Sequence, residues 1–179
     1  MSRSRMEIRR SRRLVAALGV ALVCGPAPAS SAGPRSSPED RQRFVSITRN
    51  LEQAPLNPGL KPDLQWALEW LIAAPDITVT ICRTSLPGVV ESKYPYAGEI
   101  VVQDMLSMGA FAIEHPEAAN DQAAKQLAGE EGALNAYRSI LRDKPDAKFP
   151  ALDDLLQTQA RGGLPEFARK AAISCAAKK

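Results

Sequence analysis

The polar side chains of residues 97–114 are the strongest candidates for chemistry in this 179-residue sequence. With about 100° of rotation per helical residue, four of them fall within an arc of about 80° on one side of a helix: Glu99, Gln103, Ser107 and Glu114. Two carboxylates and two hydrogen-bonding groups on one stripe could line a cleft and bind a polar ligand. A carboxyl pair could also supply the acid and the base for glycoside cleavage. The alternative is that this stripe is the side that a largely apolar helix turns to water.

His115 follows Glu114 in the sequence IEHPE and is the only histidine of the chain. One hypothesis makes it a general base beside Glu114. The other, which we favour, is a structural histidine whose positive form suits the C-terminus of a helix that ends before Pro116. A single histidine excludes a multi-histidine metal site, and the sequence has no motif for nucleotide binding, zinc hydrolysis or a serine nucleophile. We therefore expect no metal and no cofactor.

The helices that would position these residues are separated by connectors rich in proline and glycine. The sequence SPED at 37–40 is typical of a helix start, with Ser37 as the N-cap. The apolar pattern predicts helices over 38–53, about 62–73, about 96–114 and about 116–142, followed by two more that Gly162-Gly163 separates. Gly129 and Gly132 are points where the helix over 116–142 could break, because a helical glycine costs about 1 kcal/mol relative to alanine.

Residues 77–82 differ from their surroundings, because the sequence ITVTIC is β-branched and alternating. This pattern indicates a strand, which could pair with residues 89–94 as a hairpin. An isolated hairpin is marginally stable, however, and the rest of the chain offers no larger sheet. The alternative is a short helix that begins at Pro75-Asp76. The two stay open, with a slight preference for the helix.

Residues 1–32 have the three parts of a secretory signal peptide. Six arginines against one glutamate form a basic start, LVAALGVALVC at 14–24 is an apolar run of 11 residues, and small residues permit cleavage after Ala29 or Ala32. The run is shorter than the roughly 20 residues that span a bilayer. We therefore expect a secreted or periplasmic protein with no stable membrane insertion after cleavage. The export route, general secretory or twin-arginine, stays open.

Removal of residues 1–32 changes the formal net charge from +3 to −2, because it takes away six of 23 basic residues and one of 20 acidic residues. A mildly acidic chain without a basic patch lacks the electrostatic signature of nucleic-acid binding. The remaining length suits one domain with a substantial core. We expect a flexible lead over 33–37 and a single helical domain over 38–179.

Two cysteines stay in the chain after cleavage, Cys82 and Cys175. Cys175 continues the apolar face of the last helix, so its side chain should point inward, where Cys82 can meet it. Exported proteins reside in compartments that permit oxidation. We therefore predict a disulfide between the two residues. A reactive thiol at position 82 is not expected, because apolar surroundings disfavour the thiolate.

The sequence thus predicts a mainly α protein, a single-domain irregular bundle of about five to six helices, with one short hairpin near 77–94 as an option. The function most consistent with it is non-catalytic: binding of a peptide, a protein partner or a small ligand between helices. The alternative is a small cell-envelope hydrolase, acting on glycan or peptide through the carboxylates of the helix over 97–114. The catalytic candidates in that case are Glu99, Glu114 and His115.

Overall fold

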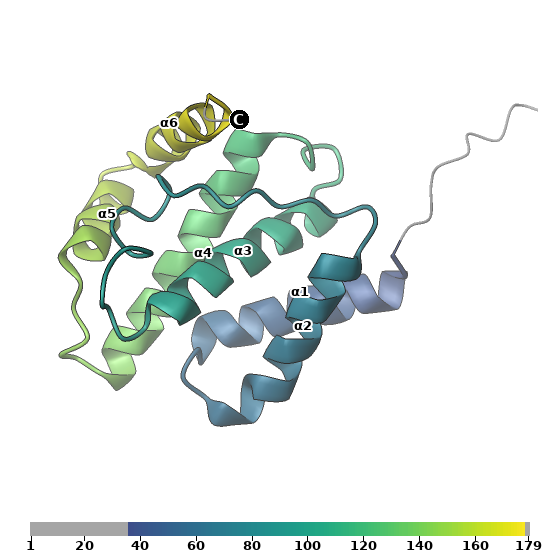
Figure 1. Ribbon diagram of the computed structural model, residues 1–179, viewed down its shortest axis with the longest axis horizontal. Helices are drawn as coiled ribbons and strands as arrows, with labels where there is room; N and C mark the ends of the chain where they lie inside the picture. The colour runs from purple at the N-terminus through teal and green to yellow at the C-terminus, as the bar shows by residue number, and fades with distance from the viewer. Residues whose placement is uncertain (1–35, 178–179) are drawn as a thin grey trace, which may run out of the picture. The chain divides into compact units, whose positions relative to one another are not determined.

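The computed structural model describes residues 36–177, which contain six α-helices and one short 3-10 helix (Figure 1). In chain order they are α1 (Pro38–Gln53), η1 (Pro58–Leu60), α2 (Lys61–Ala73), α3 (Ala97–Glu114), α4 (Gln122–Asp143), α5 (Pro150–Ala160) and α6 (Leu164–Ala176). The prediction of a mainly α bundle of five to six helices is therefore confirmed. The predicted signal peptide and residues 33–35 of the predicted lead lie outside the described residues. None of the described helices combines the length and apolar character that a membrane span requires.

Local sequence signals set the helix starts. The Ser37 hydroxyl accepts a hydrogen bond from the Asp40 amide at 3.1 Å, and Pro38 occupies the first position of α1, as predicted. Helix α4 begins later than predicted, because residues 116–120 form turns. The Asp121 carboxylate caps α4 by accepting from the amides of Ala123 and Ala124 at 2.9 and 3.0 Å.

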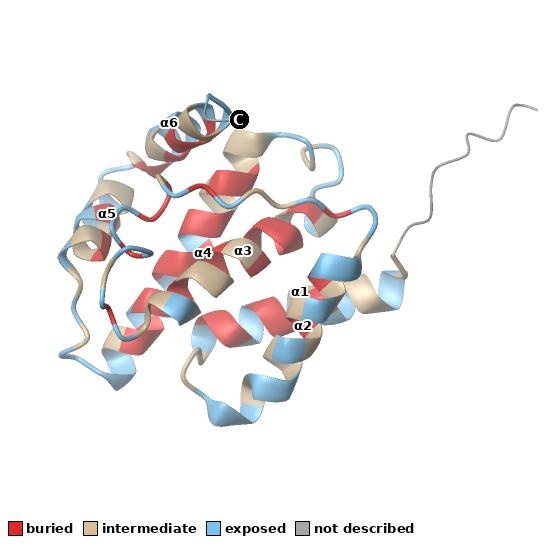
Figure 2. Ribbon diagram, viewed as in Figure 1, coloured by how far each residue is buried: buried red, intermediate tan, exposed pale blue. Residues whose placement is uncertain are grey.

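Helices α3 and α4 form the centre of this helical unit (Figure 1). Helices α1 and α2 pack beside α3 around Phe44, Leu71 and Leu106, which are 0%, 7% and 0% exposed. Helices α5 and α6 pack beside α4 around a second core cluster that includes Leu134 and Tyr137. The two central helices are therefore covered by neighbouring helices on two sides, and Figure 2 shows much of α3 and α4 as buried. This explains why α3 has so few solvent-facing positions.

Two glycines allow α3 and α4 to approach each other closely. A Cβ atom on Gly132 would lie 1.9 Å from the Ser107 hydroxyl oxygen, and one on Gly129 would lie 2.6 Å from Asp104 Oδ1. Real Cβ atoms do not approach other atoms so closely, so the backbone of α4 contacts α3 where side chains would otherwise separate them. The possible break of α4 at these glycines does not occur, because the tertiary contact outweighs their low helix propensity.

The segment over 77–82 is neither a helix nor a strand, so the slight preference for a helix was wrong. Among the backbone hydrogen bonds outside the helices of the described chain, none has an amide of residues 78–84 as its donor. The β-branched residues favour an extended backbone, but the described chain provides no second strand for pairing. Side chains hold the segment instead: Ile77 is buried, and the Lys125 ammonium donates to the Thr78 carbonyl at 2.9 Å.

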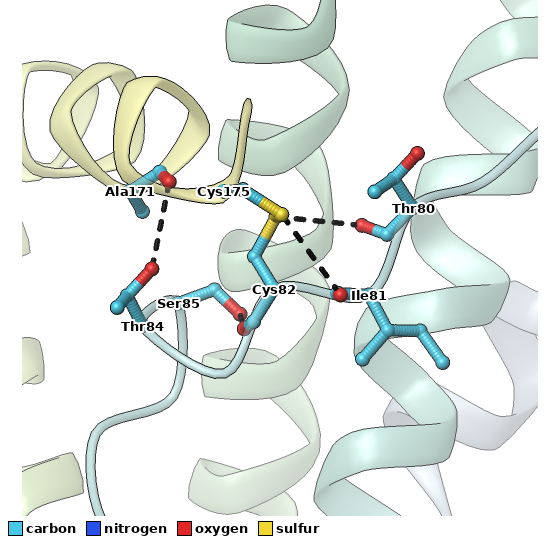
Figure 3. The surroundings of a disulfide bond; sticks show 7 residues. All are labelled: Thr80, Ile81, Cys82, Thr84, Ser85, Ala171 and Cys175. Atoms are coloured by element: carbon cyan, nitrogen blue, oxygen red, sulfur yellow. Dashed lines mark hydrogen bonds between the residues drawn. A yellow bond between two sulfur atoms is a disulfide. The ribbon is translucent and has the colours of Figure 1, made fainter. Parts of the chain in front are cut away.

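A disulfide joins the end of this segment to α6 (Figure 3). Cys82 and Cys175 have Cα atoms 5.5 Å apart and are 93 positions apart in the sequence, as the predicted pairing requires. Their sulfur atoms lie 3.8 and 4.0 Å from the carbonyl oxygens of Thr80 and Ile81, the dashed contacts in Figure 3. A bonded sulfur carries no proton, so these contacts are not hydrogen bonds. The disulfide therefore ties the connector between α2 and α3 to the last helix.

Replacing both Cys82 and Cys175 by serine is expected to lower the free energy of unfolding by up to about 4.7 kcal/mol, the loop-closure entropy for a loop of this length. Urea unfolding of the oxidised protein and the double variant measures this difference. Alkylation of the denatured, non-reduced protein provides the control, since both thiols should be protected. A double variant as stable as the oxidised protein, or two alkylated cysteines without reductant, contradicts the expectation.

Gly132→Ala is expected to destabilise the protein by about 1–3 kcal/mol, the usual cost of overpacking, although alanine is the better helix former. The added methyl group would collide with Ser107, whose short side chain cannot move aside. Gly98→Ala is the matched control, because a Cβ atom there meets nothing within 4 Å. Urea unfolding should show a loss only for Gly132→Ala. Equal effects of the two substitutions would contradict the close contact between the helices.

Candidate functional site

Glu99 and Gln103 line a pocket of about 200 Å³ between the C-terminal part of α1, helix α2 and the start of α3. Its walls are mostly apolar: Leu51, Pro55, Leu64, Gly98 and Val102. Glu99 is partly buried, and within residues 36–177 it forms no salt bridge. The pocket thus places one carboxylate without a charged partner at the rim of an apolar hollow.

A second pocket, of about 300 Å³, adjoins the first and shares four of its residues, Leu51, Pro55, Leu64 and Glu99. The segment from α1 to the start of α2, which includes η1, completes this second pocket with Leu56, Asn57, Pro58, Leu60 and Lys61. The Asn57 side chain accepts a hydrogen bond from the Gly59 amide at 2.9 Å, which orders the loop. We call the two adjoining pockets the interhelical groove.

The middle of the predicted stripe is buried and is not turned to water. Gln103 and Ser107 are each 2% exposed. The Gln103 amide donates to the Ser107 hydroxyl at 2.9 Å and to the Thr48 carbonyl of α1 at 3.3 Å. These two side chains therefore join α3 to α1, and only Gln103 also lines the groove.

The centre of this network is Glu52 on α1, which the sequence reasoning missed. Its carboxylate is almost buried and accepts hydrogen bonds from Ser107 at 3.2 Å, Arg49 at 2.7 Å and Asn135 at 3.4 Å. One carboxylate thereby connects α1, α3 and α4. A signal for it exists in the sequence, because Phe44, Thr48 and Glu52 recur every fourth residue and share a helix face.

Glu114 lies at the other end of the stripe, beside a third pocket of about 270 Å³ that Arg49, Ser107 and His115 also line. Arg49 donates to Glu114 at 2.8 Å as well as to Glu52. Burial opposes the charge of Arg49, but the two carboxylates outweigh it and raise the pKa of the guanidinium. Glu114 is therefore held in an ion pair at a partly exposed position.

His115 shows no arrangement for general-base catalysis. Its ring packs on Phe111 with centroids 4.7 Å apart, and Nδ1 lies 3.5 Å from the Glu117 carboxylate. The side chain is half exposed, and its backbone amide closes the last turn of α3 by donating to Phe111 at 2.8 Å. These contacts fit the interpretation of His115 as a structural residue at the C-terminus of α3.

Glu99 and Glu114 do not converge. They lie 15 residues apart on one continuous helix, which separates their Cα atoms by about 22 Å along the axis. Carboxyl pairs that cleave glycosides lie about 5–10 Å apart. The two candidates therefore lie at different pockets and do not form an acid and base pair. Within residues 36–177, no group of three or more histidine, cysteine, aspartate or glutamate side chains is arranged to hold a metal ion.

Glu52→Ala is expected to lower the free energy of unfolding by about 1–3 kcal/mol, because it leaves the buried Ser107 hydroxyl without its acceptor. Glu52→Gln should lose less, since its amide oxygen can still accept from Ser107. Glu117→Ala, at an exposed position, is the control. Urea unfolding measures all three, and a Glu52→Ala variant as stable as the Glu117→Ala variant contradicts the role of Glu52.

Comparisons of the chain with protein-family models, with curated proteins and with solved structures found no match. No relative therefore assigns a role to Glu99, Gln103, Ser107 or Glu114. The geometry separates them into two groups: Glu99 borders the interhelical groove, whereas Ser107 and Glu114 belong to the network and ion pair around Arg49 and Glu52.

Proposed function

We propose that this protein is an exported, non-catalytic binding module whose interhelical groove holds side chains of a partner protein or peptide. The observation that carries the proposal is the position of Glu99, a carboxylate without a charged partner among the described residues, at the rim of an apolar groove. The groove lies between rigid helices, as sites in helical proteins commonly do. The partner chemistry that matches it is a bulky apolar side chain next to lysine or arginine.

Each of the two pockets of the groove, taken separately, lies at or below the lower limit of the sites that enclose a drug-sized ligand. The two pockets measure about 200 and 300 Å³. Sites that enclose a drug-sized ligand usually measure about 300–1,000 Å³ and bury most of its surface. Pockets of this size are better suited to anchor residues, which supply most of the binding energy in protein interfaces.

Export is part of the same proposal. The signal-like residues 1–32 indicate it, and the disulfide between Cys82 and Cys175 supports it, because disulfides are typical of proteins outside the cytosol. We place the protein in the periplasm or among secreted proteins. A partner would then be another exported protein or an exposed segment of a cell-surface protein.

Selection of peptides from a random display library on the oxidised protein tests the proposal. Enriched peptides should carry a bulky apolar residue next to a basic one. Glu99→Lys should weaken their binding about tenfold or more, equivalent to about 1.4 kcal/mol, because it replaces attraction with repulsion. Fluorescence anisotropy with a labelled peptide measures the dissociation constant.

Glu39→Lys is the matched control, because Glu39 also lies in the first turn of a helix but is exposed at the start of α1. Both substitutions remove a carboxylate that interacts favourably with the dipole at a helix N-terminus, so their effects on helix stability should be similar. Binding should be weakened only by Glu99→Lys. Equal affinity of the two variants, or selection of peptides without a basic residue, would contradict the proposed role of the groove.

A further inference from the structure

The contact between α3 and α4 encloses polar side chains that lack partners. Asp104 is 1% exposed, and Gln126 and Glu130 are fully buried. Among the described residues, no hydrogen-bond partner exists for Asp104 Oδ1, for either amide atom of Gln126 or for either carboxyl oxygen of Glu130. Folded proteins leave few buried polar atoms unsatisfied, because each costs about 1–3 kcal/mol. Such a group therefore requires a physical explanation.

These side chains belong to one cluster. Gln126 and Glu130 lie one turn apart on the same face of α4. Asp104 Oδ1 lies against the backbone of α4 at Gly129, the residue before Glu130. Two carboxyl groups from facing helices thus share an interior region with one buried amide.

No positive charge balances the two carboxyl groups. Lys125 on α4 directs its ammonium to the Thr78 carbonyl, and Glu131 adds a further negative charge near Glu130. Several charged groups of the neighbouring elements form salt bridges of their own: Arg49 with Glu52 on α1, Arg41 of α1 with Asp76 of the connector, Arg83 with Glu91 on the connector, and Glu166 with Arg169 and Lys170 on α6. Within residues 36–177, neither Asp104 nor Glu130 takes part in a salt bridge. The cluster is therefore electrostatically unfavourable when both carboxyl groups are ionised.

We propose that Asp104 and Glu130 form a proton-binding pair that makes the packing of α3 on α4 depend on pH. The packing is tight when the carboxyl groups carry protons and loosens as they ionise. A proton on either carboxyl group also removes one of the two buried negative charges and turns an unpaired acceptor into a hydrogen-bond donor.

The electrostatics agree with this geometry. Burial raises the pKa of Asp104 to about 7. Burial, with added repulsion from Asp104 and Glu131, raises the pKa of Glu130 to about 9. Because both values lie above those of the unfolded chain, the stability from protonation is fully present below about pH 4 and is lost as the pH rises through 7 and 9.

The test is urea unfolding of the oxidised protein from pH 5 to pH 9. The folding equilibrium constant should fall up to a hundredfold per pH unit below pH 7, where both groups ionise on unfolding, and up to tenfold per unit between 7 and 9. The double variant Asp104→Asn with Glu130→Gln should abolish most of this dependence. Glu39→Gln, a substitution at an exposed position, should keep it. A wild-type midpoint that does not change with pH overturns the proposal.

Two further measurements keep the test decisive. If the double variant does not fold, carboxyl carbon-13 titration of the wild-type protein replaces it, and midpoints near 4 for both residues overturn the proposal. Urea unfolding at pH 9 is measured with calcium, with magnesium and with a chelator. The comparison of the three midpoints distinguishes proton binding from metal binding at the cluster. Equal midpoints in all three support the proton pair. Stabilisation by a metal ion that the double variant loses would assign the cluster to a metal and overturn it.

Discussion

The close contact between α3 and α4 is the constraint on which the rest of this structure depends. Gly129 and Gly132 carry no Cβ atom at the two points where the helices would otherwise collide. Next to that contact, Glu52 of α1 accepts hydrogen bonds from Ser107 of α3 and Asn135 of α4, so three helices share one carboxylate. It also encloses Asp104 and Glu130 away from water. A small change in the spacing of these helices would therefore alter both the network and the buried carboxyl pair.

The same packing decides which polar groups are available to a ligand. Gln103 and Ser107, in the middle of the α3 stripe, are buried and held by contacts with α1, so Glu99 and Glu114 at its two ends are its more accessible members. At one end Arg49 already neutralises Glu114, whereas Glu99 at the other end has no charged partner among the described residues. The connector over 77–82 is tied by its disulfide to α6. Gln103 contributes to both the buried network and the lining of the groove, so the stability of α3 on α1 and the shape of the groove depend on the same contact.

Local signals made part of this structure predictable. Ser37 and Pro38 mark the start of α1 wherever the helix packs, and within residues 36–177 Cys82 and Cys175 are the two cysteines, so one pairing is available. The missed features depend on distant contacts. Residues 77–82 have the composition of a strand but no partner strand, and Glu52 looks like an ordinary surface residue until α1 is placed on α3. The burial of Glu130 could not be predicted from the sequence either, because it depends on how closely α4 packs on α3 at Gly129, the preceding residue.

A double-mutant cycle between positions 107 and 132 tests the close helix contact most directly. Ser107→Gly removes the two nearest of the three atoms that a methyl group on residue 132 would meet. If the helices touch as described, Gly132→Ala should cost much less in the Ser107→Gly background than in the wild type, with a coupling free energy of at least about 1 kcal/mol. Additive losses, within about 0.5 kcal/mol, would show that the two positions are not in contact and would contradict the account.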